Sequence, residues 1–298
     1  MKRLLLACLL LIPFHAQATL NIFACEPEWA ALARELGGSD VKVYAATSAL
    51  QDPHRIEARP SLIAQMRRAD LVVCTGAELE IGWMPILLRE AGNARVQPGR
   101  PGHFEAARFV SLRDKPARLD RADGDVHAQG NPHLHTDPRN ILRVSEALAA
   151  RLAEIDPANA AAHRARGQAF TTRWQAAIAR WETRAAPLRN VPVAVQHTSF
   201  SYLIAWLGLR EVAVLEPKPG VEPSVTQLAR VAAQLQATPA KMVLRAAYQS
   251  PRPADWLANR VDIPALALPY TVGGNPAAGD LFRLFDDTLD QLLKAAAP

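Results

Sequence analysis

Four histidines in loops are the residues of this sequence whose type and spacing suit metal chemistry. The stretch GNPHLHTDPRN, residues 130–140, carries His133 and His135 between the turn signal Asn-Pro and the helix start Asp-Pro. His54 lies in QDPHRIEARPS, and His197 follows an apolar run in VPVAVQHTSF. Imidazole is a common zinc ligand, and three imidazoles suffice for a site with an open fourth position. The spacing matches no zinc finger and no H-E-x-x-H helix, so the fold must assemble any such site.

The first half of the chain, which must position two of these loops, alternates between strands and helices. Strands are predicted at residues 20–24, 41–45, 70–74 and 109–110. Helices are predicted after residue 28, around 61–68 and after residue 80. This alternation is typical of a parallel sheet with helices on both faces.

The middle of the chain is helical, and the alternation then resumes. Apolar residues recur at helical spacing up to Ile155, and a second, unusually long helix is predicted from Pro157 to about Arg184. After it, strands are predicted at residues 191–195, 212–215, 242–244 and 265–268. Helices are predicted at residues 201–207 and 224–236, near 256 and from about 280.

The sequence therefore predicts an α/β fold of two Rossmann-like lobes with parallel sheets, joined by one long helix. We expect the N-terminal lobe at residues 19–156, the linking helix at 157–186 and the C-terminal lobe at 187–298.

This architecture gives the loop histidines a common place. In open α/β sheets, ligands bind in the crevice outside the carboxyl ends of the strands. The first lobe would bring His54 and His133 to this crevice and the second lobe would bring His197. Three imidazoles that converge there would suit zinc, whereas histidines of surface turns without a ligand are the alternative that the residues alone leave open. His103 and His163 fall in an irregular segment and on an arginine-rich helix face, where exposure to solvent explains them.

The first 18 residues predict export. Lys2 and Arg3 precede an apolar run at residues 4–14 and an Ala-Gln-Ala cleavage site, which is the pattern of a secretory signal peptide. We expect a mature periplasmic chain from Thr19, without membrane insertion, because no later stretch approaches about 20 apolar residues. Without Lys2 and Arg3 the net charge falls from +5 to +3. No basic run with interleaved aromatic residues predicts nucleic-acid binding.

Cys25 and Cys74 are predicted to form a disulfide. They end the first and third predicted strands, which are neighbours in the usual doubly wound order. An oxidising compartment allows such a bond to persist.

The order of several motifs resembles a known family. The motifs are DPHRIEARPS, ADLVVCTGAELEIGW, GNPHLHTDPRN, QHTSFSYLIAWLGL and EPKPGVEPS, with the long helix between the third and the fourth. This succession resembles the solute-binding proteins of ABC transporters for zinc and manganese, over essentially the whole mature chain.

The resemblance implies a monomeric binding protein rather than an enzyme. Such a protein captures Zn²⁺ between its lobes and delivers it to the membrane permease of an ABC transporter. Carried over residue by residue, the family's ligands fall on His54, His133 and His197. A histidine at the third position, where manganese-binding members have a carboxylate, favours zinc over manganese.

The fourth ligand departs from the family pattern. Many members place an aspartate just after the last strand, but this chain has LALPYTVGGN there, without an acid. Water, Asp280, His135 and another carboxylate all stay open as the fourth ligand. Before the loop, a reduced form of the family's histidine- and acid-rich insertion is one interpretation of Asp120, Asp123, Asp125 and His127. An ordinary polar loop is the interpretation we prefer.

Two other functions would use the same three histidines. An exported zinc hydrolase would activate water at the open fourth position. Against it, no Glu or Asp adjoins His133 or His197 in the manner of a general base, while Glu57 and Glu78 stay open for that role. A metal-binding adhesin or a metallochaperone for another exported protein is the second alternative, and the sequence does not separate it from transport.

Overall fold

The structure is a computed structural model that describes residues 19–118 and 124–297. The expected signal peptide lies outside the described residues. Among the helices that the structure describes, none has the length and apolar character needed to cross a membrane.

The N-terminal lobe is a four-stranded parallel sheet in the order β2-β1-β3-β4. Its strands are β1 (Leu20–Ala24), β2 (Val41–Ala45), β3 (Leu71–Cys74) and β4 (His103–Glu105). Its helices are α1 (Pro27–Gly37), α2 (Pro60–Arg68) and α3 (Met84–Ala91). The strand interiors are apolar because helices cover the sheet, which leaves the loops at the strand ends to carry polar groups.

The predicted fourth strand at residues 109–110 is wrong. Phe109 instead ends a 3₁₀ turn, Ala106–Phe109, and the strand that pairs with β3 comes earlier, at β4. A three-residue strand leaves little pattern in the sequence: Phe104 is its one apolar residue and lies between the polar residues His103 and Glu105.

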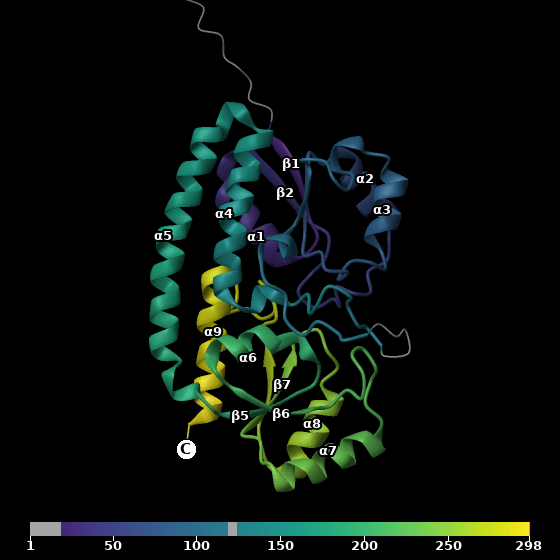
Figure 1. Cartoon of the computed structure of the whole chain (residues 1–298), viewed down its shortest axis with the longest axis vertical. Helices are drawn as coiled ribbons and strands as arrows, with labels where there is room; N and C mark the ends of the chain where they lie inside the picture. The colour runs from purple at the N-terminus through teal and green to yellow at the C-terminus, as the bar shows by residue number, and fades with distance from the viewer. Residues whose placement is uncertain (1–18, 119–123, 298) are drawn as a thin grey trace, which may run out of the picture.

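The C-terminal lobe repeats this arrangement, with a parallel sheet in the order β6-β5-β7-β8. Its strands are β5 (Pro192–Val195), β6 (Arg210–Val214), β7 (Met242–Ala246) and β8 (Ala265–Leu268). Its helices are α6 (Ser201–Leu207), α7 (Val225–Ala237) and α8 (Arg252–Val261). Figure 1 shows the two lobes stacked along the longest axis of the molecule.

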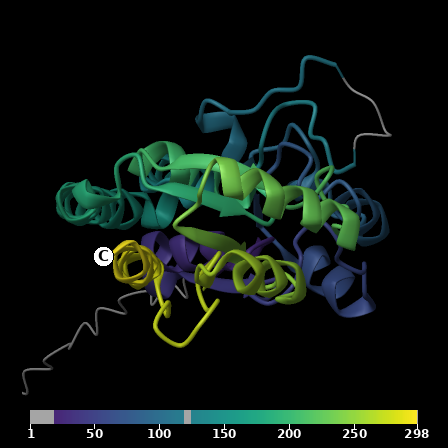
Figure 2. The same ribbon diagram turned by 90° about the horizontal axis from the view of Figure 1, so that it is seen from below.

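Three long helices connect and brace the lobes. They are α4 (Pro138–Ile155), α5 (Ala160–Arg184) and α9 (Leu281–Ala296). As predicted, one long helix, α5, joins the lobes: it packs on α1 and α4 at one end and on α9 at the other. Seen from below, α5 and α9 stand together on one side of the molecule (Figure 2).

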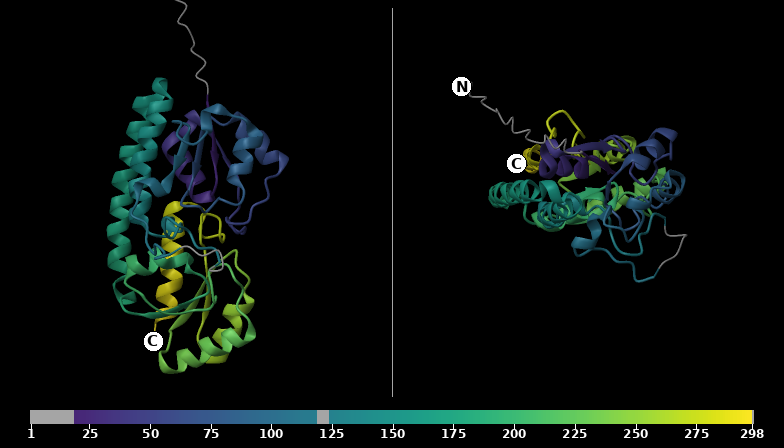
Figure 3. Two further views of the ribbon diagram at one scale, coloured as in Figure 1. Left: turned by 45° about the vertical axis from the view of Figure 1, so that its right-hand side comes forward. Right: turned by 90° about the horizontal axis from the view of Figure 1, so that it is seen from above.

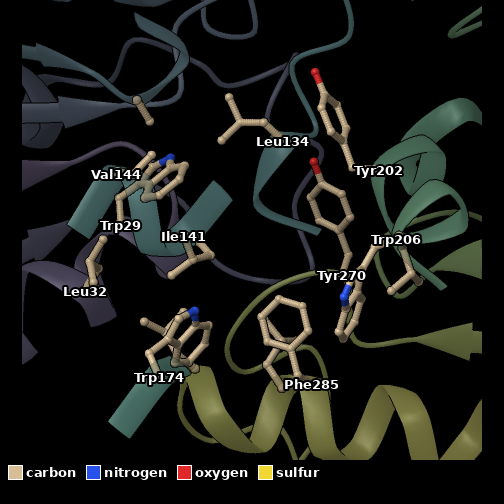
Figure 4. Packing of buried hydrophobic residues seen from close by; sticks show 14 of the residues in the cluster. Trp29, Leu32, Leu134, Ile141, Val144, Trp174, Tyr202, Trp206, Tyr270 and Phe285 are labelled. Carbon is tan, nitrogen blue, oxygen red and sulfur yellow. The ribbon is translucent and has the colours of Figure 1, made fainter. Parts of the chain in front are cut away.

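A single apolar core continues from one lobe into the other. Trp29 of α1, Ile141 of α4, Trp174 of α5 and Phe285 of α9 belong to the same cluster of buried residues (Figure 4). The Trp174 indole also donates to the Pro138 carbonyl oxygen at 2.8 Å, which fixes α5 on the start of α4. The strut formed by α5 is therefore packed into both lobes rather than suspended between them.

His103 and His163 are buried, so the prediction that solvent exposure explains them is wrong. Only 8% of His103 and none of His163 is exposed. The His163 Nε2 lies 2.9 Å from an Asp156 carboxylate oxygen, and Arg166 donates to the Leu36 carbonyl oxygen of α1. The end of α1 covers this arginine-rich helix face, and the sequence of the helix alone does not reveal that cover.

The predicted disulfide between Cys25 and Cys74 is confirmed. β1 and β3 are neighbouring parallel strands, and the two Cα atoms lie 4.8 Å apart. The bond therefore ties together the carboxyl ends of two central strands of the N-terminal sheet.

Candidate metal centre

Three loops at the carboxyl ends of the two sheets carry the candidate ligands. His54 lies in the turn after β2, His133 in the loop before α4, and His197 two residues after β5 ends. The Asp52 carboxylate accepts from the His54 backbone N–H at 3.0 Å, and the Asn131 side chain accepts from the His133 N–H at 2.9 Å. These side-chain to backbone bonds are the local turns that Asp and Asn favour, and they fix both loops.

The structure brings the three imidazoles together. One ring nitrogen from each of His54, His133 and His197 lies within 4.8 Å of the other two. The Nε2 atoms of His133 and His197 are 3.2 Å apart. Two imidazole nitrogens that share one tetrahedral zinc at the usual bond length lie about 3.4 Å apart. The spacing of this pair therefore fits two ligands of one ion.

A carboxylate or a hydroxyl group contacts the Nδ1 atom of each of the three rings. The Nδ1 of His54 is 2.8 Å from an Asp52 carboxylate oxygen, and the Nδ1 of His197 is 2.7 Å from a Glu216 carboxylate oxygen. The Nδ1 of His133 is 2.6 Å from the Tyr270 hydroxyl. A carboxylate bound at Nδ1 keeps the proton there, which leaves the Nε2 lone pair free for a metal.

Burial keeps the central candidate ligand, His133, neutral. His133 is 1% exposed, and burial, followed by the neighbouring His197 and His54, holds its pKa well below the ordinary value. A low pKa favours the uncharged imidazole, which is the form that binds a metal. The Nε2 of His54 is buried and has no hydrogen-bond partner among the described residues. A buried nitrogen without a partner is costly, and a metal ion bound there would remove that cost.

The outer partners are electrostatically suited to this role. Burial raises the pKa of Asp52, but the hydrogen bonds and charge of His54 outweigh this effect, so the pKa is lowered overall. Asp52 therefore stays a carboxylate. Burial raises the pKa of Tyr270 well above the ordinary value, so its hydroxyl stays protonated. Tyr270 then provides a neutral partner for the most deeply buried of the three candidate ligands.

The site lies in a cleft between the lobes. A cavity of about 240 Å³ is lined by Asp52, His54 and Arg55 from the N-terminal lobe and, among others, by His197 and Glu216 from the C-terminal lobe. The Arg55 guanidinium crosses this cleft and donates to the Gly220 carbonyl oxygen at 3.2 Å. One small ligand can therefore contact both lobes at once.

Among the proposed fourth ligands, Asp280 and His135 have other partners. Asp280 caps α9 by accepting from the Arg283 backbone N–H at 2.9 Å. The Nδ1 of His135 lies 3.2 Å from a Glu28 carboxylate oxygen, and its Nε2 lies 3.0 Å from the Tyr270 carbonyl oxygen. Neither residue belongs to the cluster of three imidazoles.

The segment before the loop places one more histidine near the centre. The His127 ring lies 5.3 Å from the His54 ring, centroid to centroid, and burial lowers the pKa of His127 to about 4. Asp120 and Asp123 lie outside the described residues. Asp125 forms a 3.7 Å ion pair with Arg55 at the cleft. The short segment before the loop therefore places His127 beside the candidate ligands.

His135 and Glu28 form a buried connection between the lobes. Glu28 of α1 is 1% exposed and accepts from the Thr271 hydroxyl of the C-terminal lobe as well as facing His135. Thr271 follows Tyr270 in the loop between β8 and α9, which reaches the junction of the lobes (Figure 3). This loop thus contacts a candidate ligand through the Tyr270 hydroxyl and α1 through Thr271.

The sequence did not reveal the outer partners Asp52, Glu216 and Tyr270. Asp52 and Glu216 lie in the quoted motifs DPHRIEARPS and EPKPGVEPS, so their position in motifs was available as a signal. Tyr270 occupies LALPYTVGGN, the stretch in which an acid was sought. A search for carboxylates alone misses a phenol that acts through hydrogen bonding.

Comparison with known proteins gives a consistent family. The family described as the periplasmic component A of the zinc-uptake complex matches residues 22–295. The high-affinity zinc uptake system protein of Bacillus subtilis is 23% identical over 215 residues, which cover 70% of this chain and 65% of that protein. The chain thus matches slightly less than two thirds of the length of this relative.

Solved structures share the fold over nearly the whole chain. A crystal structure of a zinc-uptake component A has a TM-score of 0.75 at 20% identity and covers 94% of this chain and 100% of its own. A manganese-bound periplasmic metal-binding protein of Candidatus Liberibacter asiaticus has a TM-score of 0.75 at 15% identity, with the same two coverages. The likeness at these identities concerns the fold.

Proposed function

The chain belongs to the family of periplasmic zinc-uptake component A proteins, and from this membership we propose that it captures Zn²⁺ and delivers it to the permease of an ABC transporter. The metal is cargo, and the protein needs no reaction to carry it. Its task is to bind the ion between the lobes and to release it at the membrane. The B. subtilis relative, whose name states zinc uptake, supports this assignment.

One observation carries the proposal: three imidazoles converge with their Nδ1 atoms already engaged. We assign His54, His133 and His197 as the metal ligands. The carboxylates of Asp52 and Glu216 and the hydroxyl of Tyr270 orient them. Such outer partners fix the ring orientation and the protonation state of metal-binding histidines. The neighbouring buried His135, in contrast, directs both ring nitrogens at oxygen atoms of the protein and neither at the cluster of three imidazoles.

The proposed cargo is zinc rather than manganese. Three neutral nitrogen donors suit zinc, whereas manganese prefers sites richer in carboxylate oxygen. Within the described residues, no carboxylate joins the three nitrogens in a common cluster. Water is the fourth ligand in this proposal, and the cleft gives it room. An open fourth position also offers a route for ligand exchange when the ion is handed on.

The remaining parts of the proposal concern place and partners. We propose a monomeric periplasmic protein, with lobes at residues 19–156 and 187–298 and a link at 157–186. The membrane permease would meet the chain at the cleft, since the ion must leave there.

Competitive metal binding tests the proposal. Purified protein, stripped with a chelator, is titrated calorimetrically with Zn²⁺ and with Mn²⁺. We expect one tightly bound zinc per chain and manganese binding that is weaker by more than about 100-fold, as the donor set demands. Equal affinity for both ions would contradict the zinc assignment. If neither Zn²⁺ nor Mn²⁺ binds at one ion per chain, the transport proposal is wrong.

A further inference from the structure

A second group of metal-binding residue types lies behind the loop that carries His54. Cys25, Cys74 and Glu80 each offer a ligand atom, and these atoms lie within 4.8 Å of one another. The exposed fractions of the three residues are 0%, 3% and 4%. Cys25 directly follows β1 and Cys74 ends β3, so two neighbouring strands of the sheet fix two of the three donors. Nothing in the three-histidine centre uses this group.

The carboxyl groups around the disulfide lack a counter-cation. Glu80 accepts from the Thr75 backbone N–H at 2.7 Å, and the neighbouring Glu26 is 2% exposed with one carboxyl oxygen that has no partner among the described residues. In the part of the chain that the structure describes, no Lys, Arg or His forms an ion pair with either carboxyl. Backbone N–H groups of Thr75 and Gly76 and the Thr75 hydroxyl donate to these carboxyls, and a proton or a metal ion would supply the positive charge that they lack.

The two carboxyls share a proton in the oxidised protein. Burial, followed by the charges of Glu80 and Glu28, raises the pKa of Glu26 well above its ordinary value. Burial also raises the pKa of Glu80, to about 7. The Glu26 and Glu80 carboxyls lie close enough for each to change the pKa of the other. Glu80 is the one that ionises at the lower pH, so it is the carboxylate available to a cation near neutral pH.

We propose that Cys25, Cys74 and Glu80 form a second site for a thiophilic divalent cation such as Zn²⁺, which the disulfide closes and which opens on reduction. The sulfur atoms of a disulfide are poor ligands, whereas thiolates bind zinc at about 2.3 Å. The two Cα atoms, 4.8 Å apart, allow both sulfurs to reach one ion.

The chemistry of opening the site is a two-electron reduction. A phosphine and water, or a dithiol, reduce the S–S bond and leave two thiols, while the phosphine becomes its oxide or the dithiol its disulfide. The metal then forms two metal–sulfur bonds, and the two thiol protons pass to solvent. Glu80 binds as a carboxylate, and the proton that it shared stays on Glu26.

This site makes zinc a competitor of oxidation. Disulfide formation needs a thiolate as nucleophile, and a metal bound to both thiolates withdraws it. A chain that meets zinc before it is oxidised would therefore form the Cys25–Cys74 bond more slowly. The order of metal binding and oxidation then decides which form of the N-terminal lobe accumulates.

Cobalt spectroscopy tests the proposal on the full chain. The protein is reduced with a water-soluble phosphine, freed of the reductant without oxygen, shown to have two titratable thiols and a folded circular dichroism spectrum, and titrated with Co²⁺. We expect one cobalt per oxidised chain and two per reduced chain. Only the reduced chain should show a thiolate-to-cobalt charge-transfer band, because imidazole ligands produce none.

Variants separate this site from the three-histidine centre. Reduced His133→Ala should keep the thiolate band, which distinguishes failure of this proposal from failure of the transport proposal. Glu80→Gln keeps an acceptor for the Thr75 N–H but loses the charged ligand. The loss of even an outer partner costs about 10–100-fold, so Glu80→Gln should weaken the thiolate site at least about tenfold. Cys25→Ser/Cys74→Ser should lack the band.

A rate measurement covers the case in which the reduced chain does not stay folded. Reoxidation of the two thiols is followed with and without saturating Zn²⁺, and zinc should slow it at least about tenfold in the wild type and less in Glu80→Gln. The absence of a thiolate band in a folded, reduced chain would overturn the proposal. A band in the double serine variant, or equal reoxidation rates with and without zinc, would overturn it as well.

Discussion

His133 and His135 stand two residues apart in one loop, are each 1% exposed, and differ in every contact that matters. His133 has a hydroxyl at Nδ1 and another imidazole nitrogen at Nε2. His135 has a carboxylate facing Nδ1 and a backbone carbonyl at Nε2. The Nε2 of His133 thus faces another candidate ligand, whereas both ring nitrogens of His135 face oxygen atoms of the protein. Residue type and burial therefore do not separate the two histidines, whereas the groups that their ring nitrogens face do.

The same account sorts the other buried histidines. The Nδ1 of His103 contacts the Val96 carbonyl oxygen, and the Nε2 of His163 contacts Asp156. These rings serve the packing of the N-terminal lobe and its long helices. In His54 and His197, an Nδ1 carboxylate contact is combined with an Nε2 directed into the common cluster. The contrast between His133 and His135 thus extends to two classes of histidine, which mutation can separate.

The largest expected effect on zinc binding comes from the ligands themselves. His54→Ala, His133→Ala and His197→Ala should each weaken binding at neutral pH by more than about 100-fold, because loss of a ligand should exceed the 10–100-fold cost of losing an outer partner. Isothermal titration calorimetry measures the change. If all three variants bind zinc as the wild type does, the metal site lies elsewhere and the transport proposal loses its chemical basis.

The next largest effect is expected from the outer partners. Tyr270→Phe removes only the hydroxyl beside His133, and Glu216→Gln removes only the charge beside His197, so each should weaken zinc binding about 10–100-fold. Tyr248→Phe is the matched control, since Tyr248 packs on Tyr270 but donates to no candidate ligand in the described hydrogen bonds. An equal loss in all three variants would indicate a general loosening of the cleft rather than orientation of the ligands.

The sequence predicted most of the helices and strands because the patterns that indicate them lie within short stretches of the chain. Apolar runs and helical spacing recovered nearly every element, and the paired cysteines at two strand ends indicated their own bond. The convergence of His54, His133 and His197 followed from strand-end geometry together with the family resemblance. Their role as metal ligands stays a prediction.

What the sequence did not predict depends on contacts between distant segments. Tyr270 reaches His133 across 137 residues, and Glu28 meets Thr271 across 243 residues. His163 is buried because α1 packs over it, and the sequence of its own helix does not show this contact. Hydrogen-bond partners of this kind are set by the assembled lobes.

A smaller effect at neutral pH is expected from His127, and it should appear mainly on acidification. Burial holds the pKa of His127 at about 4 and that of His133 well below its ordinary value. Unfolded histidines titrate near pH 6.5, so from about pH 6.5 down to about 4 the unfolded chain binds more protons. The stability of the metal-free protein should therefore fall as the pH falls through this window.

Thermal melts across this pH range, with and without zinc, check the prediction. Zinc requires neutral imidazoles, so its stabilisation should also disappear as the pH falls. His127→Asn should recover about 1–2 kcal/mol of the metal-free loss at the acid end, after allowance for its partial exposure, and change zinc affinity at neutral pH by less than about tenfold. A melting temperature that does not change between pH 7 and 4 would count against the buried neutral state of both rings.

The smallest change in zinc affinity, and the largest change in stability, should come from His135. His135→Ala leaves the buried Glu28 facing a cavity in place of an imidazole, with only the Thr271 hydroxyl as a partner, and a buried polar group that loses a partner costs about 1–3 kcal/mol in addition to the lost packing. Zinc affinity should fall by less than about tenfold, because both of its ring nitrogens face protein acceptors and none faces the ion. Denaturant unfolding of the metal-free protein and calorimetry of the folded protein measure the two quantities separately.

A double-mutant cycle makes this contrast quantitative. Glu28→Gln removes the charge that His135 faces, so the double variant should be less destabilised than the sum of the single variants, by about 1–3 kcal/mol. The same cycle between Glu28 and His133 should be nearly additive, because His133 contacts the Tyr270 hydroxyl rather than the carboxylate. If His135→Ala instead abolishes zinc binding in a protein of unchanged stability, His135 is a ligand and the division between the two neighbouring histidines is wrong.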